Sequence, residues 1–326
     1  MVSDKDIEQA VGILRSGGLV AFPTETVYGL GADAASPPAV RGIFELKGRP
    51  ATHPVIVHLA DAVQVAHWAR EVPGAARVLA QRFWPGPLTL VLRRARSVSD
   101  VVTGGQDTIA LRVPSHPIAR QLLARFGGGI AAPSANRHGR VSATTAEHVR
   151  SEFGAAALFV LDGGESQVGI ESTIVDVSGS AVSLLRPGSI GVAEIEQALG
   201  APLAASAANA PRAPGTLAAH YAPQTPLSVM ERDLALELAA SLTRQGKRVA
   251  VLALGGQRPL LSGLEWIAAP RQAAAYAHAL YASLRRLDEC GCDALIVEAP
   301  PKGHEWTAIH DRLARAAGGV SAPEAT

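Results

Sequence analysis

The sequence predicts an α/β protein with two domains, and three observations support this. The chain has 326 residues, which is too long for one typical domain. Along residues 1–200, short apolar segments interleave with helical patterns without a strict order, which predicts a mixed sheet. After residues 200–214, which are rich in Ala, Pro, Ser and Asn, strands and helices alternate regularly. That alternation predicts a smaller, doubly wound parallel sheet.

The first domain is expected to begin with a helix that Ser3 caps, with Asp6 three residues further on, and that Gly17 and Gly18 end. An apolar strand follows at residues 19–22 and stops at Pro23. Apolar runs predict further strands at residues 55–59, 88–92, 108–113, 129–132, 158–161, 172–177 and 182–185. Amphipathic patterns predict helices at residues 36–46, 61–70, 74–83, 117–126, 145–152 and 192–199.

The second domain is expected to contain strands at residues 227–230, 248–254, 265–268 and 294–298. Helices are expected between and after them, at residues 232–244, 271–288 and 305–317. We therefore expect a catalytic domain over residues 1–200, a linker over residues 201–224 and a second domain over residues 225–326.

Composition excludes several classes of protein. Apolar residues make up 48% of the chain, which excludes global disorder, and the net charge of +1 argues against a protein that mainly coats nucleic acid. Cys290 and Cys292 are too few for a zinc site and poorly spaced for an ordinary disulfide. The charged N-terminus and the lack of an apolar run of membrane-spanning length predict a cytoplasmic protein.

Residues 20–31 form the stretch around which the chain is organised. If the segment after Pro23 stays extended, Thr24, Thr26 and Tyr28 share one face, and Gly29 and Gly31 allow close backbone approach. Two hydroxyls and a phenol on one face suit a small polar ligand. The alternative is a hydroxyl-rich edge strand.

Other polar residues lie at strand ends, and each has a structural alternative. Lys47 and Arg49 are two residues apart in a loop, so both cations can converge on a polyphosphate, or simply be solvated. Arg112 interrupts an apolar strand and needs a partner, which is either a ligand carboxylate or an acidic side chain of the protein. His58, within an apolar strand, is more often a core histidine than a ligand-binding one.

Known phosphate-binding and catalytic motifs are absent. The sequence contains no Gly-x-x-x-x-Gly-Lys-Ser/Thr, no Gly-x-Gly-x-x-Gly between a strand and a helix, and no Gly-x-Ser-x-Gly elbow. It also has no His/Cys/Asp cluster at the spacing of metal ligands.

In this order the motifs resemble the YrdC/Sua5 family, the L-threonylcarbamoyladenylate synthases. The segments that carry the resemblance are residues 23–31, 47–50, 84–89, 110–114, 133–136, 169–176 and 185–188. Residues 214–216 and 220–223, with the domain after them, resemble the two-domain Sua5 form. The resemblance implies a twisted open mixed sheet with a concave cleft, followed by a Rossmann-like domain.

The resemblance also implies a nucleotidyltransferase reaction. ATP, L-threonine and bicarbonate would give L-threonylcarbamoyl-AMP and pyrophosphate, with Mg²⁺ and without an organic prosthetic group. The product would pass to the tRNA threonylcarbamoyl transferase machinery that modifies adenosine 37. We expect any RNA binding to be weak and no membrane partner.

Residue roles follow from the resemblance, motif by motif. Lys47 and Arg49 would be the catalytic cations and hold the ATP phosphates, and the further nucleotide contacts would be Thr108, Asn136, Ser142, Thr144, Arg186 and Tyr221. Arg112 would pair with the threonine carboxylate, and the residues around threonine would be Thr26, Thr24, His58, Ser134 and Ser172. His53 departs from the family, which commonly has asparagine at this position.

Two rival interpretations stay open at this point. An RNA-binding module of the same fold would lack adenylating activity, and the near-zero net charge and the missing basic stripe count against it. A relative that uses carbamoyl phosphate is the second, and the linker and the second domain count against that one.

Overall fold

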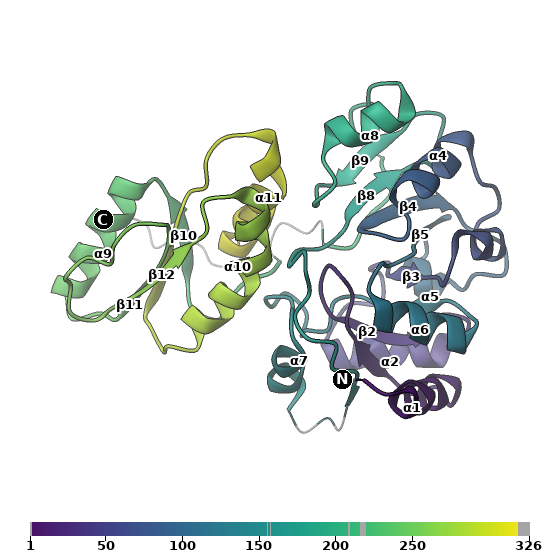
Figure 1. Ribbon diagram of the computed structural model, residues 1–326, viewed down its shortest axis with the longest axis horizontal. Helices are drawn as coiled ribbons and strands as arrows, with labels where there is room; N and C mark the ends of the chain where they lie inside the picture. Colours follow the sequence, from purple (N-terminus) through teal and green to yellow (C-terminus); the bar gives the residue numbers. More distant parts are fainter. Residues whose placement is uncertain (1, 155, 157, 208, 216–219, 319–326) are drawn as a thin grey trace. The chain divides into compact units, whose positions relative to one another are not determined.

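The computed structural model describes residues 2–154, 156, 158–207, 209–215 and 220–318, and the chain forms two compact units (Figure 1). Unit 1 comprises Met1–His138 and Ala143–Thr216, and unit 2 comprises Gly139–Ser142 and Leu217–Thr326. The short segment 139–142 thus belongs to unit 2, although the residues on both sides of it belong to unit 1.

Unit 1 is built on a nine-stranded mixed sheet with the order β7-β1-β2-β6-β3-β5-β4-β8-β9. Its strands are β1 (Val20–Phe22), β2 (Gly29–Asp33), β3 (Ile56–His58), β4 (Leu88–Arg93), β5 (Thr108–Arg112), β6 (Ile130–Ala131), β7 (Phe159–Val160), β8 (Thr173–Asp176) and β9 (Ser183–Arg186). The pairs β1/β7, β3/β5 and β4/β8 are parallel and the other neighbours are antiparallel, so the predicted mixed sheet is confirmed.

The helices of unit 1 largely follow the predicted segments. They are α1 (Asp4–Arg15), α2 (Pro37–Lys47), η1 (Ala62–Gln64), α3 (Val65–Trp68), α4 (Gly74–Phe83), α5 (Asp100–Thr103), α6 (Pro117–Phe126), α7 (Ala146–Phe153) and α8 (Val192–Leu199). The continuous helix expected at residues 61–70 was wrong, because Ala69 is extended and forms a bridge with Arg94. Only one 3₁₀ turn and one short α-helix form in that segment.

The helices cover the two faces of this sheet unequally. One face packs against α2, α4 and α8 through a large apolar core that includes Ile43, Leu79 and Ile195. At the β1/β6 end the opposite face packs against α1 and α6, which lie side by side, through Val20, Phe22 and Ile130 (Figure 1). Towards β4, β5 and β8 the described residues of that second face form a small apolar cluster, to which Ala213 contributes.

Unit 2 contains a four-stranded, all-parallel sheet with the order β10-β13-β11-β12, as predicted. Its strands are β10 (Leu227–Met230), β11 (Val249–Leu254), β12 (Leu264–Ala269) and β13 (Ala294–Glu298). Its helices are α9 (Arg232–Arg244), α10 (Ala273–Asp288), η2 (His304–Trp306) and α11 (Thr307–Ala317). No helix in the described parts of the chain has both the length and the apolar content needed to cross a membrane.

Candidate functional site

Strand alternation gathers most of the predicted polar residues on one face of the nine-stranded sheet. In β5, Thr108 and Arg112 lie on the same face as Ala110, which belongs to the small apolar cluster of that face. By the same rule, His58 lies on this face with Ile56. In β4 the face carries Thr89 and Val91, and in β8 it carries Ile174. Ser172 lies two residues before Ile174, next to the start of β8, and falls on the same face. Arg186 pairs directly with Ile174, so it shares this face as well. We call this surface the polar face.

At the β3/β5 end of the polar face, Arg112 is held by three groups. Its Nη2 lies 2.8 Å from Oε1 of Glu25, its Nη1 donates to Oγ1 of Thr26 over 2.8 Å, and its Nε donates to the carbonyl oxygen of Gly86 over 3.3 Å. Arg112 and Glu25 are each 3% exposed. The open alternative from the sequence, a carboxylate of the protein as the partner of Arg112, is therefore what the structure shows.

The charge of Arg112 sets the ionisation of its neighbours. Burial alone would raise the pKa of the Glu25 carboxyl, but the Arg112 guanidinium outweighs burial and holds this pKa below its usual value. His58 pairs with Arg112 across β3 and β5, and burial followed by the Arg112 charge lowers the pKa of His58 to about 3. His58 is therefore neutral near pH 7, and its buried Nδ1 has no hydrogen-bond partner among the described residues. A buried ring nitrogen without a partner can form a hydrogen bond with a bound ligand.

Thr24 and Thr26 form a hydroxyl chain with a fixed direction. Oγ1 of Thr24 donates to the carbonyl oxygen of Val27 over 2.5 Å, so its only proton is used. In the 2.8 Å contact between the two hydroxyls, Thr26 must therefore be the donor and Thr24 the acceptor. The proton of Thr26 is then also used, and its oxygen accepts from Arg112. Thr26 can offer a ligand only an acceptor, and Thr24 has a structural role.

Tyr28 does not join the two threonines, contrary to the expectation of a shared extended face. Strand β1 ends at Phe22, and residues 23–28 are not in a strand. The Tyr28 hydroxyl donates to the carbonyl oxygen of Gly164 over 2.7 Å and accepts from the backbone N–H of Gly163. It anchors the loop after β7.

Lys47 fixes the turn that follows β6. It is the last residue of α2, before the left-handed C-cap Gly48, and it is 3% exposed. Its Nζ donates to the carbonyl oxygen of Ser134 over 2.6 Å and to that of Asn136. An ammonium has three donors, so one remains for a ligand. Burial, followed by the charge of Arg49, lowers the pKa of Lys47 well below its usual value, whereas the two carbonyl acceptors favour the charged form.

Arg49 lies beside a pair of histidines. Its Nη2 donates to the carbonyl oxygen of Pro54 over 2.8 Å. The rings of His53 and His138 are 5.6 Å apart between centroids. Burial and then Arg49 lower the pKa of both histidines, that of His138 to about 4. This cluster is therefore cationic through Arg49 and Lys47, while the two imidazoles are neutral.

Arg186 connects β8 to the segment after α8. Its Nη2 donates to the carbonyl oxygen of Ser172 over 2.9 Å and to the Ser172 hydroxyl over 3.2 Å, and its Nη1 donates to the carbonyl oxygen of Pro214 over 2.7 Å. The Ser172 hydroxyl is also 2.7 Å from that of Thr89. The predicted linker is thus attached to the polar face at Pro214.

The remaining predicted residues lie away from Arg112. Thr108 is at the opposite end of β5 from Arg112, about 13 Å along the strand. Thr144 is fully buried, and its backbone N–H and hydroxyl contact Nδ1 of His148. Ser142 and Tyr221 belong to unit 2, where Tyr221 has φ of 63° and stacks on Tyr281 with ring centroids 5.7 Å apart.

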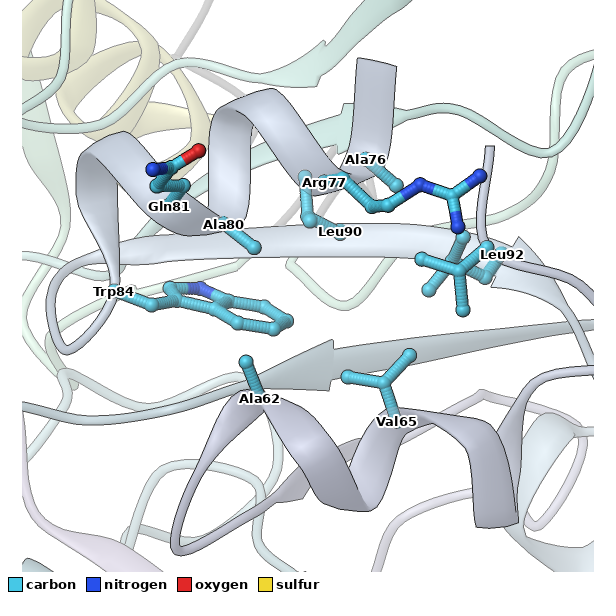
Figure 2. Close-up of a pocket in the computed structure, with 10 residues that line it drawn as sticks. Ala62, Val65, Ala76, Arg77, Ala80, Gln81, Trp84, Leu90 and Leu92 are labelled. Carbon is cyan, nitrogen blue, oxygen red and sulfur yellow. The ribbon is translucent and has the colours of Figure 1, made fainter. Parts of the chain in front are cut away.

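A hollow of about 340 Å³ lies on the opposite face of the sheet from the polar face (Figure 2). Leu90 and Leu92 line it, and in β4 these alternate with Thr89 and Val91 of the polar face. Its other walls are Ala62, Val65, Val72, Ala76, Arg77, Ala80, Gln81 and Trp84. None of the residues predicted to bind substrate lines it, so this apolar hollow is separate from the candidate site.

Sequence reasoning did not assign a role to Glu25, Thr89 or His138. Glu25 and Thr89 both lie inside motifs that carried the resemblance, and an acidic residue between two threonines was the available signal for Glu25. Within the described residues, no group of three or more His, Cys, Asp and Glu could hold a metal ion.

Comparison with known proteins also gives two parts, whose boundary lies at residues 188–190. Residues 12–188 match the family described as "Telomere recombination", and residues 190–318 match "Threonylcarbamoyl-AMP synthase, C-terminal domain". The threonylcarbamoyl-AMP synthase of Pyrococcus abyssi is 40% identical, with 97% of this chain and 95% of the relative covered. That of Bacillus subtilis is 39% identical, with 97% and 94% covered.

A solved structure is also similar over both units. The crystal structure of Pyrococcus abyssi Sua5 complexed with L-threonine is 40% identical, with a TM-score of 0.89 and with 98% of this chain and 96% of the other covered.

Proposed function

The chain belongs to the Sua5 family of two-domain threonylcarbamoyl-AMP synthases, and we propose that it carries out this reaction on the polar face of unit 1. The substrates would be ATP, L-threonine and bicarbonate, and the products L-threonylcarbamoyl-AMP and pyrophosphate. The observation that carries this proposal is the convergence of Arg112, His58, Ser172 and Arg186 on one sheet face. These side chains supply two fixed cations and neutral polar groups in a buried setting.

We assign the threonine subsite to the β3/β5 end of this face. The guanidinium of Arg112 would pair with the substrate carboxylate, because arginine and a carboxylate form strong, charge-assisted hydrogen bonds that are often bidentate. Thr26 would accept from a donor of the substrate, because its own proton is used. The neutral ring of His58 supplies an unpartnered Nδ1, and the other hydroxyls proposed here are those of Ser134 and Ser172.

We assign the phosphates to the cations at the end of α2. Lys47 and Arg49 would bind them from one side and Arg186 from another, with Asn136 and Thr108 as further contacts. For Ser142, Thr144 and Tyr221 the nucleotide role stays a prediction from the resemblance. Since the described residues offer no carboxylate cluster for a metal, Mg²⁺ would enter as part of the MgATP substrate, where it offsets phosphate charge.

The chemistry requires alignment and charge compensation. The amine of threonine forms a C–N bond to the carbon of CO₂ and loses a proton to solvent to give a carbamate; when bicarbonate is the source of the carbon, one water is also released. A carbamate oxygen then forms a bond to the α-phosphorus while the bond to the pyrophosphate oxygen breaks. Cations preoriented in a water-poor site stabilise the charge that develops on the phosphates. No covalent intermediate with the protein is needed.

The product would serve the modification of tRNA adenosine 37 and would pass to a transferase that acts on the tRNA.

Purified protein should release pyrophosphate only when ATP, threonine and bicarbonate are all present. Equal release with serine, or without any amino acid, would refute the substrate assignment. An RNA-binding module would instead show strongly salt-dependent RNA binding that is indifferent to threonine.

A further inference from the structure

The carboxylate of Glu25 is a buried charge in the proposed threonine subsite that no substrate role explains. It is 3% exposed and lies 2.8 Å from Nη2 of Arg112. His116 is the other titratable group that faces it, and burial holds the pKa of this imidazole below its usual value, so it is neutral near pH 7. Arg112 is therefore the charged partner of Glu25 in this part of unit 1.

A buried ion pair is a poor way to stabilise a fold. Removing two charges from water costs about as much as their attraction returns, and apolar residues of similar size often serve equally well. A pair of this kind is explained better by the orientation that it gives to a functional group. Arg112 is such a group, because it is the proposed partner of the substrate carboxylate.

The contacts of Arg112 show how this orientation arises. Gly86 fixes the Nε side of the guanidinium, Thr26 fixes Nη1 and Glu25 fixes Nη2. Three contacts in different directions define both the position and the plane of the group. The contacts of Nε and Nη1 are hydrogen bonds and that of Nη2 is an ion pair, so two of the five donors are used and both terminal nitrogens keep N–H groups for a ligand. Without Glu25 only the Nε and Nη1 contacts would remain.

We propose that Glu25 is a positioning residue, which acts through Arg112 to hold the guanidinium in the orientation that receives the threonine carboxylate. The inference rests on the proposed function. It predicts that Glu25 affects the binding of threonine rather than the binding of ATP, and that this effect depends on an intact Arg112.

The test uses the full chain and two substitutions. Glu25→Asp keeps the charge but shortens the side chain by one methylene, and Glu25→Gln keeps the shape but removes the charge. Glu25→Gln leaves Arg112 without its counter-charge and can unfold the protein, so Glu25→Asp provides the decisive measurement. Glu8→Gln is the matched control, because it breaks an exposed ion pair with Arg125 in the same unit. Thermal unfolding would confirm that each variant is folded.

KM for threonine and KM for ATP should be measured separately, together with threonine affinity by calorimetry. We expect Glu25→Asp to raise KM for threonine by about 10- to 100-fold and to leave KM for ATP within about twofold. In an Arg112→Lys background the same change should have less than about a twofold effect, because the group that Glu25 orients is gone.

Three results would overturn the inference: an unchanged KM for threonine in folded Glu25→Asp, an equal rise in both KM values, or an undiminished effect in the Arg112→Lys background. The unsubstituted protein separates the two proposals. If it binds no threonine, the proposed function and this inference both fail. If it binds threonine and the variant binds it equally well, only the role of Glu25 is refuted.

Discussion

The Nζ atom of Lys47 lies 2.6 Å from the carbonyl oxygen of Ser134, and this contact joins the end of α2 to the turn after β6. The same ammonium also donates to the carbonyl oxygen of Asn136. Lys47 therefore has two functions in our proposal. It shapes the turn that presents Ser134 and Asn136, and it keeps one donor for a phosphate.

Lys47→Ala should therefore lower both activity and stability. Two buried carbonyls would lose a charged donor, which should reduce the free energy of unfolding by about 2–3 kcal/mol. The loss of one cation beside the phosphates should lower kcat/KM for ATP by about 10²–10³-fold. Urea unfolding and pyrophosphate release measure the two effects. Lys5→Ala, an exposed lysine of α1, is the control and should change neither.

The polar face was predictable because strands have a period of two. The apolar run around Arg112 indicated a strand, and alternation then placed Thr108, Ala110 and Arg112 on one face. The pairing of His58 with Arg112 was not predictable in this way, because β3 and β5 are not consecutive strands and their register is set by the sheet. Local turn chemistry predicted that Ser134 and Asn136 would lie at the end of a strand.

Contacts between distant segments were not predictable from one sequence. Lys47 and Ser134 are 87 positions apart, and Arg112 and Thr26 are 86 apart. No periodicity relates such residues, so neither the partner of Lys47 nor that of Glu25 could be read from the pattern. The expected helix at residues 61–70 failed for a similar reason, because tertiary pairing with Arg94 extends the backbone at Ala69.

Thr26 should be sensitive to loss of its oxygen but tolerant of loss of its methyl group. Thr26→Val removes the acceptor for Arg112 and for the substrate at nearly constant volume, so KM for threonine should rise by about 10- to 100-fold. Thr26→Ser keeps the hydroxyl chain and should stay within about threefold of the unsubstituted protein. Steady-state pyrophosphate release, measured at varied threonine concentrations, gives KM for threonine in both variants. Equal KM values for the two variants would contradict the assignment.

Arg186 should control the attachment of the segment around Pro214. Arg186→Ala removes the donor to the carbonyl oxygen of Pro214, so this segment should detach more often. Trypsin should then cleave after Arg212 at least about fivefold faster, because protease access follows the population of the open form. Arg93→Ala, an exposed arginine of β4, is the control. Unchanged cleavage in Arg186→Ala would show that other contacts hold the segment.

Filling the apolar hollow should leave catalysis intact. Ala80 lines it from α4, and Ala80→Leu adds three carbons to a space of about 340 Å³ on the face opposite Arg112 (Figure 2). Burying this added apolar surface should raise the free energy of unfolding by about 0.5–1 kcal/mol. We expect kcat/KM for both substrates to stay within about twofold. A tenfold loss would mean that the hollow belongs to the site.

The pH dependence of stability should contain a contribution from His58. Burial and the Arg112 charge lower its pKa from 6.5 to about 3 in the folded chain, whereas in the unfolded chain it keeps its ordinary pKa. Between these two values the unfolded state binds one more proton than the folded state at this residue. The free energy of unfolding therefore falls as the pH falls, by up to about 1.4 kcal/mol per pH unit from His58 alone. Above about pH 6.5 this contribution is constant.

His58→Gln cannot titrate, so its unfolding free energy should fall less steeply between about pH 6 and about pH 4.5. The difference in slope from the unsubstituted protein should approach about 1.4 kcal/mol per pH unit. Glu25, His53, His116 and His138 titrate in both proteins, so their contributions cancel in this difference. His67→Gln, at an exposed position of α3, is the matched control for replacing a histidine by glutamine. Identical slopes for His58→Gln and the unsubstituted protein would show that His58 has the same pKa in the folded and unfolded states, which would contradict the lowered value.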